Sequence, residues 1–169
     1  MTGAIAFLVF AFHLSAASPG IWIDVPFVRQ VKNGCGAASI AMILQYWGER
    51  SEAADPGRIH QRTYSLDAEG TYASSMERYF NEHGFRAFAF RGTWTDLRSH
   101  LEKGRPLIVC LKLDKATRHY VVVAGAGESF ISINDPAGRK LRKLDRAGFE
   151  KQWSGSENWT LLALPHRNP

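Results

Sequence analysis

Apolar side chains follow a helical period through the first half of this chain. Between Cys35 and Trp47 they recur every three or four residues, and Gly48 follows at the position where helices commonly end. The pattern predicts a helix that begins at Cys35 or Gly36 and ends at Trp47. The other helices predicted in this way cover 72–83, the stretch from a Thr93 or Thr95 cap to Lys103, and 146–153.

Two-residue alternation of apolar and polar side chains, typical of strands, dominates the second half. The predicted strands are 21–28, 85–90, 106–113, 119–125, 129–134, 139–144 and 158–164. Residues 49–71 are polar and predict a loop-rich connection with one short helix. Helices come mostly first and strands mostly last, which favours an α+β fold with N-terminal helices packed on an antiparallel sheet. We expect one domain, from residue 18 to residue 169.

The first 17 residues have the pattern of a secretory signal peptide. Ala4 to Leu14 is apolar apart from His13, too short to span a bilayer comfortably, and small residues follow at Ser15-Ala16-Ala17. We therefore expect a signal peptide over 1–17 and an exported protein, periplasmic or extracellular. If the segment is not cleaved, it would tether the protein to the membrane.

Composition excludes several classes of function. The chain has 169 residues, of which 45% are hydrophobic and 22% charged, which is ordinary for one globular domain. It has no Gly-rich phosphate loop, no Walker motif, no zinc-type Cys/His spacing and no aromatic RNA-binding motif. We therefore expect no metal, no cofactor, no nucleic-acid partner and no ATP-binding domain in this chain.

The net charge of +5 is concentrated in one short run. Its alternation with apolar residues suits a strand with one wet face. The alternative is contact with an anionic envelope surface. The cations of this run are Arg139, Lys140, Arg142 and Lys143.

Cys35 stands where a helix should begin, between Gly34 and Gly36. The free N–H groups of a first helical turn and the positive end of the helix dipole stabilise a thiolate. The glycines keep side-chain bulk away from the sulfur, and Gln30 offers an amide N–H to a developing oxyanion. The second cysteine, Cys110, lies in an apolar strand-like run, where a packed free thiol is favoured over a disulfide with Cys35.

A thiolate nucleophile needs a base, and His119 is the best candidate because it opens a buried strand directly after a polar turn. In a hairpin made of 119–125 and 129–134, the start of the first strand lies beside the end of the second. Asp135 would therefore return next to His119 and orient the imidazole. The competing histidines are His13, His60, His83, His100 and His166.

These blocks together resemble a known family. The segments that carry the resemblance are Gln30 with Asn33-Gly34-Cys35-Gly36 through Met42, Tyr46-Trp47-Gly48, 106–109, 119–123 and 134–138. They are similar to the bacteriocin-leader-processing cysteine peptidases, family thirty-nine of the cysteine peptidases, which are papain-like domains. Members usually carry Asp before the Cys-Gly pair, where this chain has Gly34.

The resemblance implies a thiol peptidase with Cys35 as nucleophile, His119 as base, Asp135 as orienting residue and Gln30 as oxyanion donor. It also implies a peptide substrate, cleaved after Gly-Gly as in the exporter relatives. With an export signal and no Walker motif, we expect a free-standing peptidase. Two alternatives stay open: a transpeptidase or amidase that uses the same acyl-enzyme, and a peptide-binding domain without catalysis.

Overall fold

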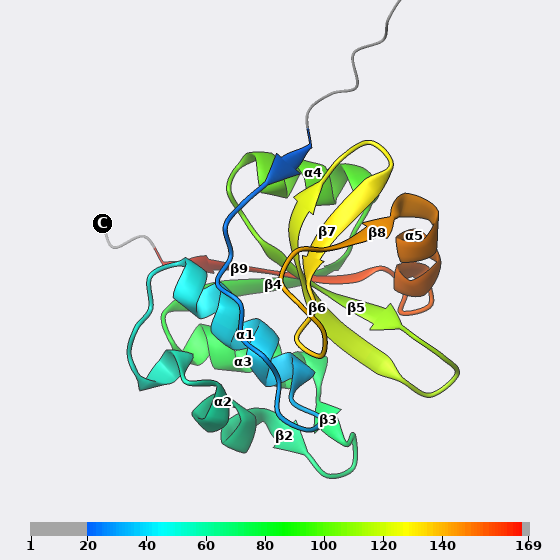
Figure 1. The fold of residues 1–169 in the computed structure, drawn as a ribbon. Coiled ribbons are helices and arrows are strands. Elements are labelled where there is room, and N and C mark those ends of the chain that lie inside the picture. The colour runs from blue at the N-terminus through cyan, green and yellow to red at the C-terminus, as the bar shows by residue number, and fades with distance from the viewer. Residues whose placement is uncertain (1–19, 167–169) are drawn as a thin grey trace, which may run out of the picture.

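The structure, a computed structural model, describes residues 20–166 (Figure 1). Its helices are α1 (Cys35–Tyr46), α2 (Pro56–Thr63), α3 (Ala73–Glu82), α4 (Trp94–Glu102) and α5 (Arg146–Ser154), with a short 3-10 helix, η1 (Glu52–Ala54), before α2. Its strands are β1 (Ile21–Trp22), β2 (Tyr64–Ser65), β3 (Gly70–Thr71), β4 (Phe85–Arg91), β5 (Leu107–Lys112), β6 (Arg118–Ala126), β7 (Phe130–Asn134), β8 (Arg142–Asp145) and β9 (Trp159–Pro165).

One antiparallel sheet forms the centre of the molecule. Its strands lie in the order β4-β9-β5-β6-β7-β8, and β1 pairs with the far end of β6. The short strands β2 and β3 form a separate hairpin. The predicted α+β fold with an antiparallel sheet is therefore confirmed.

Helices cover both faces of this sheet. In β6, Val122 points into an apolar cluster shared with α1, α2 and α3, whereas Val121 and Val123 point into a second cluster shared with α4 and α5. Figure 1 shows α1, α2 and α3 gathered on one side and α4 and α5 placed apart from them. Because both faces are buried, the central strands are continuously apolar, as the sequence pattern indicated.

The predicted helix ends are confirmed. Gly48, Gly84 and Gly104 follow α1, α3 and α4 with φ of +91°, +80° and +66°. Only glycine adopts these left-handed values without a steric cost, so each one stops its helix.

Three predicted segments differ from the structure. The strand predicted over 21–28 is a strand only at Ile21–Trp22, after which Ile23 N–H makes one further hydrogen bond to β6, to Ala124 O at 2.8 Å. The strand predicted over 139–144 starts later, at Arg142, because Leu141 has a left-handed φ of +51°. The 49–71 connection contains more helix than expected. The Asp55 side chain caps α2 by accepting a hydrogen bond from Arg58 N–H, and Pro56 occupies the first turn of that helix.

The predicted signal peptide, 1–17, lies outside the described residues. Within residues 20–166, no helix combines the length and the apolar character that crossing a bilayer requires.

The cap of α4 gives a direct test of the fold. The Thr93 hydroxyl accepts from Asp96 N–H at 3.1 Å, and the Asp96 carboxylate accepts from Thr93 N–H at 2.8 Å. Thr93→Ala removes half of this capping box and should lower the free energy of unfolding by about 1 kcal/mol in a urea titration. Thr95→Ala, on an exposed neighbour outside the cap, should change it by less than about 0.5 kcal/mol. Equal losses in the two variants would contradict the capping role.

Candidate active site

Cys35 is the first residue of α1, and close packing explains the glycine that follows it. A Cβ at Gly36 would lie 2.6 Å from Cβ of Thr71, so α1 can approach β3 only with glycine there. At Gly34 a Cβ would come within 3.0 Å of Val31. The two glycines therefore let the chain turn tightly into the helix and leave the sulfur at its N-terminus.

His119 and Asp135 meet at the end of the β6–β7 hairpin. Nε2 of His119 lies 2.8 Å from Oδ1 of Asp135, and both side chains are buried. The ladder ends where Val122 pairs with Asn134, after which the chain turns. In that turn, Ala137 N–H donates to Oδ1 of Asp135 at 3.1 Å and fixes the carboxylate.

The sulfur of Cys35 is hydrogen-bonded to His119 and to the backbone N–H groups of Gly36 and Tyr120. Burial alone would raise the pKa of the Cys35 thiol. These hydrogen bonds and the charge of the imidazolium outweigh that effect, so the pKa lies below its ordinary value. The charged pair of thiolate and imidazolium is therefore the favoured state.

The imidazole of His119 holds its proton strongly. Burial lowers the pKa of His119, but its bonds to Asp135 and Cys35 raise the value to about 9. Since Nε2 faces Asp135, the other ring nitrogen, Nδ1, is left for the sulfur. The arrangement places a proton donor directly beside the nucleophile.

Arg142 completes the site. The sequence analysis placed this residue in the basic run and did not assign it to the site. Its Nη1 donates to Oδ2 of Asp135 at 2.7 Å. The hydrogen bond from His119 and the guanidinium of Arg142 hold the pKa of Asp135 well below its usual range. Arg142 returns beside Asp135 because Ile133 pairs with it across the next hairpin, a register that the alternation of the 139–144 run did not reveal.

Two other cations of the basic run also have partners. Lys140 forms an ion pair with Asp24, and Nζ of Lys143 lies 3.7 Å from the centre of the Phe130 ring. Contact of this run with an anionic surface stays a prediction.

Gln30 is tied to the same loop through its backbone, since Gln30 N–H donates to Pro136 O at 3.1 Å. Its side-chain Oε1 is buried and has no hydrogen-bond partner among residues 20–166. An unpaired buried amide oxygen is costly, so a bound ligand that donated a hydrogen bond to it would gain free energy.

Asn134 is a second residue that the sequence did not single out. It is fully buried; its Nδ2 donates to Val25 O at 3.0 Å and its Oδ1 accepts from Leu141 N–H at 3.0 Å. One side chain thereby joins the N-terminal segment to both ends of the Asp135 turn. We interpret it as a support for that turn.

Both cysteines are free. Cys110 is buried in β5, and burial raises the pKa of its thiol, so it is the packed residue that the sequence favoured. Among the other described histidines, Nδ1 of His83 lies 2.7 Å from Tyr79 O, and burial lowers the pKa of His100. Of the histidines that the structure describes, His119 is the one hydrogen-bonded to Cys35.

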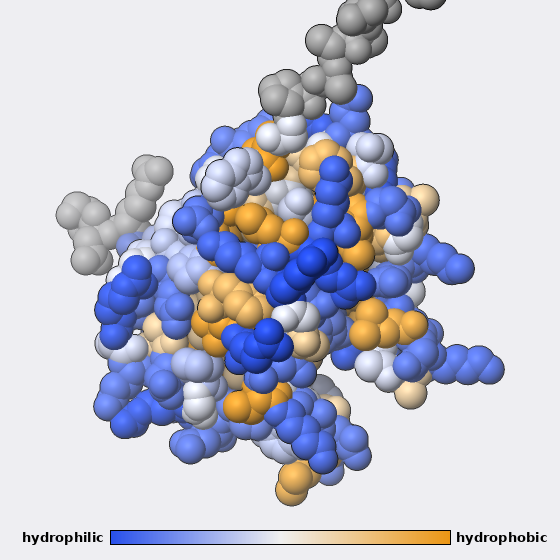
Figure 2. Space-filling view, in the orientation of Figure 1, coloured by the Kyte–Doolittle hydropathy of each residue, from blue (hydrophilic) through white to orange (hydrophobic). Residues whose placement is uncertain are grey.

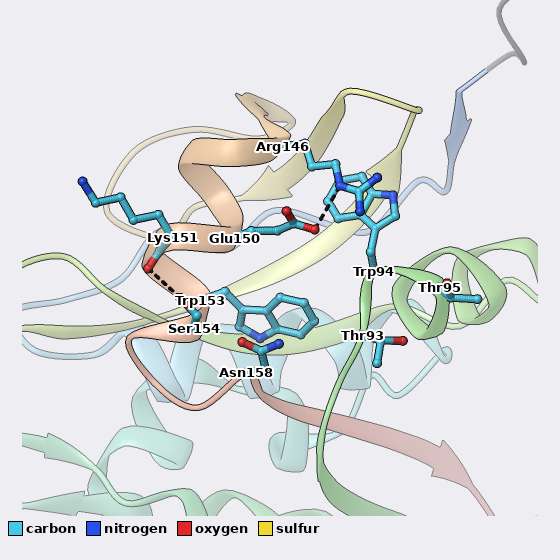
Figure 3. Close-up of a pocket in the computed structure, with 9 residues that line it drawn as sticks. All are labelled: Thr93, Trp94, Thr95, Arg146, Glu150, Lys151, Trp153, Ser154 and Asn158. Atoms are coloured by element: carbon cyan, nitrogen blue, oxygen red, sulfur yellow. Dashed lines mark hydrogen bonds and ion pairs between the residues drawn. The ribbon is translucent and has the colours of Figure 1, made fainter.

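Two cavities lie elsewhere in the described structure. One of about 490 Å³ includes Tyr120, the residue next to His119, in its wall. Another of about 570 Å³ lies between the start of α4 and α5, where Figure 3 shows Arg146 against the Trp94 ring and bonded to Glu150. None of the four candidate residues lines either cavity. Hydrophilic side chains cover most of the face seen in Figure 2, with smaller hydrophobic patches between them.

The family model described as "Peptidase C39 family" matches residues 24–162, which include all four candidate residues. The chain belongs to the Peptidase C39 family. It is a cysteine peptidase of that family, and the papain-like identity suggested by its motifs is confirmed.

Several relatives of this C39 chain are transport proteins. It is 34% identical over 130 residues to the lactococcin-G-processing and transport ATP-binding protein LagD of Lactococcus lactis subsp. lactis, covering 75% of this chain and 17% of LagD. It is 32% identical over 122 residues to the transport/processing ATP-binding protein ComA of Streptococcus pneumoniae, covering 72% of this chain and 16% of ComA. The match is thus confined to a small part of each relative.

Solved structures share the fold. A C39-like peptidase from Bacillus anthracis superposes with a TM-score of 0.74 at 17% identity, covering 89% of this chain and all of that one (100%). The peptidase domain of Streptococcus ComA gives 0.70 at 21% identity, covering 85% and 100%. A double glycine motif protease from an AMS/PCAT transporter, in complex with its leader peptide, gives 0.65 at 23% identity, covering 88% and 96%.

The charged state of this C39 site can be tested by alkylation. Because the pKa of Cys35 is lowered, it should react with iodoacetamide at pH 6 faster than a free thiol such as glutathione. His119→Ala should slow this reaction at pH 6 by about tenfold or more, since one unit of pKa is a tenfold change in thiolate. Cys110→Ser is the matched control and should leave the rate unchanged. Labelling of Cys35 at the rate of glutathione would rule out the activated pair.

Proposed function

We propose that this C39 peptidase hydrolyses peptide bonds with Cys35 as nucleophile, His119 as acid and base, and Asp135 as orienting carboxylate. The observation that carries the proposal is the continuous chain of contacts from Cys35 through His119 and Asp135 to Arg142. The contacts favour the charged form of each of these four residues. Negative and positive charges alternate along the series, from the Cys35 thiolate to the Arg142 guanidinium. Such a chain stabilises the thiolate before substrate arrives.

Acylation follows from this starting state. The Cys35 thiolate attacks the carbonyl carbon, and the electron pair moves to the carbonyl oxygen. The N–H of Cys35 and the amide of Gln30 donate hydrogen bonds to that oxyanion. The His119 imidazolium then gives its proton to the leaving amine as the C–N bond breaks, which leaves a thioester on Cys35 and a neutral imidazole.

Deacylation reverses the proton transfer. His119 takes a proton from water, the resulting hydroxide attacks the thioester, and the sulfur leaves as thiolate beside the renewed imidazolium. Asp135 holds the ring through Nε2 throughout. Arg142 keeps that carboxylate ionised, so it always orients the ring as an acceptor.

For the substrate, we propose a peptide with a Gly-Gly pair before the scissile bond. Support comes from the relatives: one is a double glycine motif protease in complex with a leader peptide, and others are processing proteins by name. From the apolar segment at 1–17, we further propose that the enzyme works outside the cytoplasm. Cell fractionation that found the protein only in the cytoplasm would refute this location.

The catalytic roles predict graded losses. Cys35→Ala should abolish cleavage of a diverse peptide library read by mass spectrometry, because no other group can form the acyl-enzyme. Gln30→Ala should lower kcat by about 10²–10³-fold, the cost of losing one oxyanion donor. Cleavage sites in the wild-type digest should follow Gly-Gly pairs. Retained hydrolysis by Cys35→Ala would show that another nucleophile acts.

The same pair predicts a bell-shaped pH dependence. The value of kcat/KM should rise as Cys35 loses its proton at a pH below the ordinary thiol range. It should fall as pH rises through about 9, because His119 then loses the proton that the leaving amine needs. The two limbs belong to the coupled pair rather than to single residues. Steady-state rates between pH 5 and 10 would measure this, and activity still rising at pH 10 would contradict it.

Arg142 is a positioning residue, and its neighbour offers a matched control. Arg142→Gln removes a charged hydrogen bond to Asp135 and should lower kcat/KM by about 10–100-fold, with partial recovery in Arg142→Lys. Lys143→Gln removes the same charge one residue away, where it contacts Phe130 instead, and should have little effect. Equal losses in Arg142→Gln and Lys143→Gln would indicate a general effect of charge.

A further inference from the structure

A third cavity, of about 600 Å³, lies at the opposite end of α1 from Cys35. The helix has 12 residues, so its ends are about 18 Å apart, and Trp47, which follows the helix, belongs to the cavity wall. Figure 1 shows the end of α1 near the end of β9, which contributes Leu164 and Pro165 to the wall. The cavity is therefore separate from the pair of thiolate and imidazolium.

Hydrogen bonds from the end of α1 hold two walls of this cavity in place. The indole Nε1 of Trp47 donates to Ala163 O of β9 at 3.1 Å. The Tyr46 hydroxyl donates to Gly104 O at 2.7 Å, in the loop between α4 and β5. The two rings meet edge to face with their centres 5.1 Å apart. The cavity is therefore formed by fixed elements before any ligand arrives.

Within the described part of the chain, three cations and no acidic residue line this cavity. The cations are Arg86 on β4, and Lys103 and Arg105 in the loop after α4. None of the three belongs to an ion pair among residues 20–166. Lys103 and Arg105 stabilise the negative end of the α4 dipole, but Arg86 lies on a strand and has no such role. Positive charge without a partner in the protein favours an anionic ligand.

The number and kind of these cations favour a phosphate group over a carboxylate. A carboxylate has one charge and two oxygens, and one arginine fork can pair it. A phosphate monoester has a charge of about −1.5 to −2 at pH 7 and three free oxygens, which suits two guanidinium groups and one ammonium group. Two aromatic rings line the same cavity: that of Trp47, which is half-buried, and that of Phe88, with 44% of its surface exposed. They offer an apolar surface to the organic part of such an ester.

We propose that this cavity binds an organic phosphate, with the phosphoryl group held by the three cations and the organic part against the two aromatic rings. The proposal is independent of the peptidase function, because the described lining contains none of the four candidate catalytic residues. A soluble phosphate monoester and the headgroup of phosphatidic acid share this chemistry. Only the lipid would bring the protein to a membrane, so separate tests distinguish the two sources.

Calorimetric titration of the full-length chain with phenyl phosphate tests the site. Phenyl phosphate should bind at least about tenfold tighter than inorganic phosphate, which lacks the ring, and than benzoate, which has the ring but a single charge. Arg86→Gln should weaken the binding of phenyl phosphate by about tenfold or more, because a charged hydrogen bond is lost. Arg91→Gln is the matched control: it removes the same charge from the same strand, outside this cavity, and should change the affinity by less than about twofold.

Phe88→Ala tests the aromatic part of the site. The variant should reduce the preference for phenyl phosphate over inorganic phosphate and leave the affinity for inorganic phosphate unchanged. Sedimentation with phosphatidylcholine vesicles, with and without phosphatidic acid, identifies the source. Binding that needs phosphatidic acid and is lost in Arg86→Gln indicates a lipid headgroup, whereas binding of phenyl phosphate without binding to either vesicle indicates a soluble ester.

Several results would overturn the proposal. Phenyl phosphate could bind no tighter than benzoate, or bind Arg86→Gln as tightly as the wild type. Equal losses in Arg86→Gln and Arg91→Gln would show a general effect of charge instead of a site. Alkylation of Cys35 by iodoacetamide should proceed at the same rate with phenyl phosphate present, and protection of Cys35 would place the ligand at the active site instead.

Discussion

A buried carboxylate must be paired, and in this molecule the pairing of Asp135 sets the geometry of everything around it. His119 holds one oxygen at 2.8 Å and Arg142 the other at 2.7 Å. Three consecutive strands are needed to bring these groups together, since His119 lies on β6, Asp135 follows β7 and Arg142 opens β8. The site is therefore a property of the double hairpin rather than of any one segment.

The N-terminal half is fastened to that double hairpin by neutral hydrogen bonds. Asn134 binds Val25 O with one end of its amide and Leu141 N–H with the other, and Gln30 N–H bonds Pro136 O. These contacts hold the segment that leads into Cys35 against the turn that carries Asp135. Asn134 is fully buried, so losing either of its bonds would leave a buried amide group unpaired. The position of the N-terminal half against the double hairpin is therefore well specified.

Sequence reasoning reached most of this arrangement because much of it is local. Gly48, Gly84 and Gly104 stop helices through their own φ, and hairpin topology alone puts Asp135 beside His119. It failed where the structure depends on a contact between distant residues or on one residue with an unusual backbone conformation. The left-handed Leu141 delays the start of β8 and turns Arg142 from a surface cation into a partner of Asp135, which alternation alone could not reveal.

The candidate catalytic residues and the cavity of about 490 Å³ come from different parts of this fold. The motif blocks that match the family lie at the start of α1, the start of β6 and the end of β7. The cavity wall is drawn largely from β4, the start of α3 and the start of β9. Only Tyr120 and its neighbours belong to both. Substitutions in the wall can therefore change the cavity without replacing Cys35, His119 or Asp135. Family membership consequently establishes the reaction more firmly than the substrate.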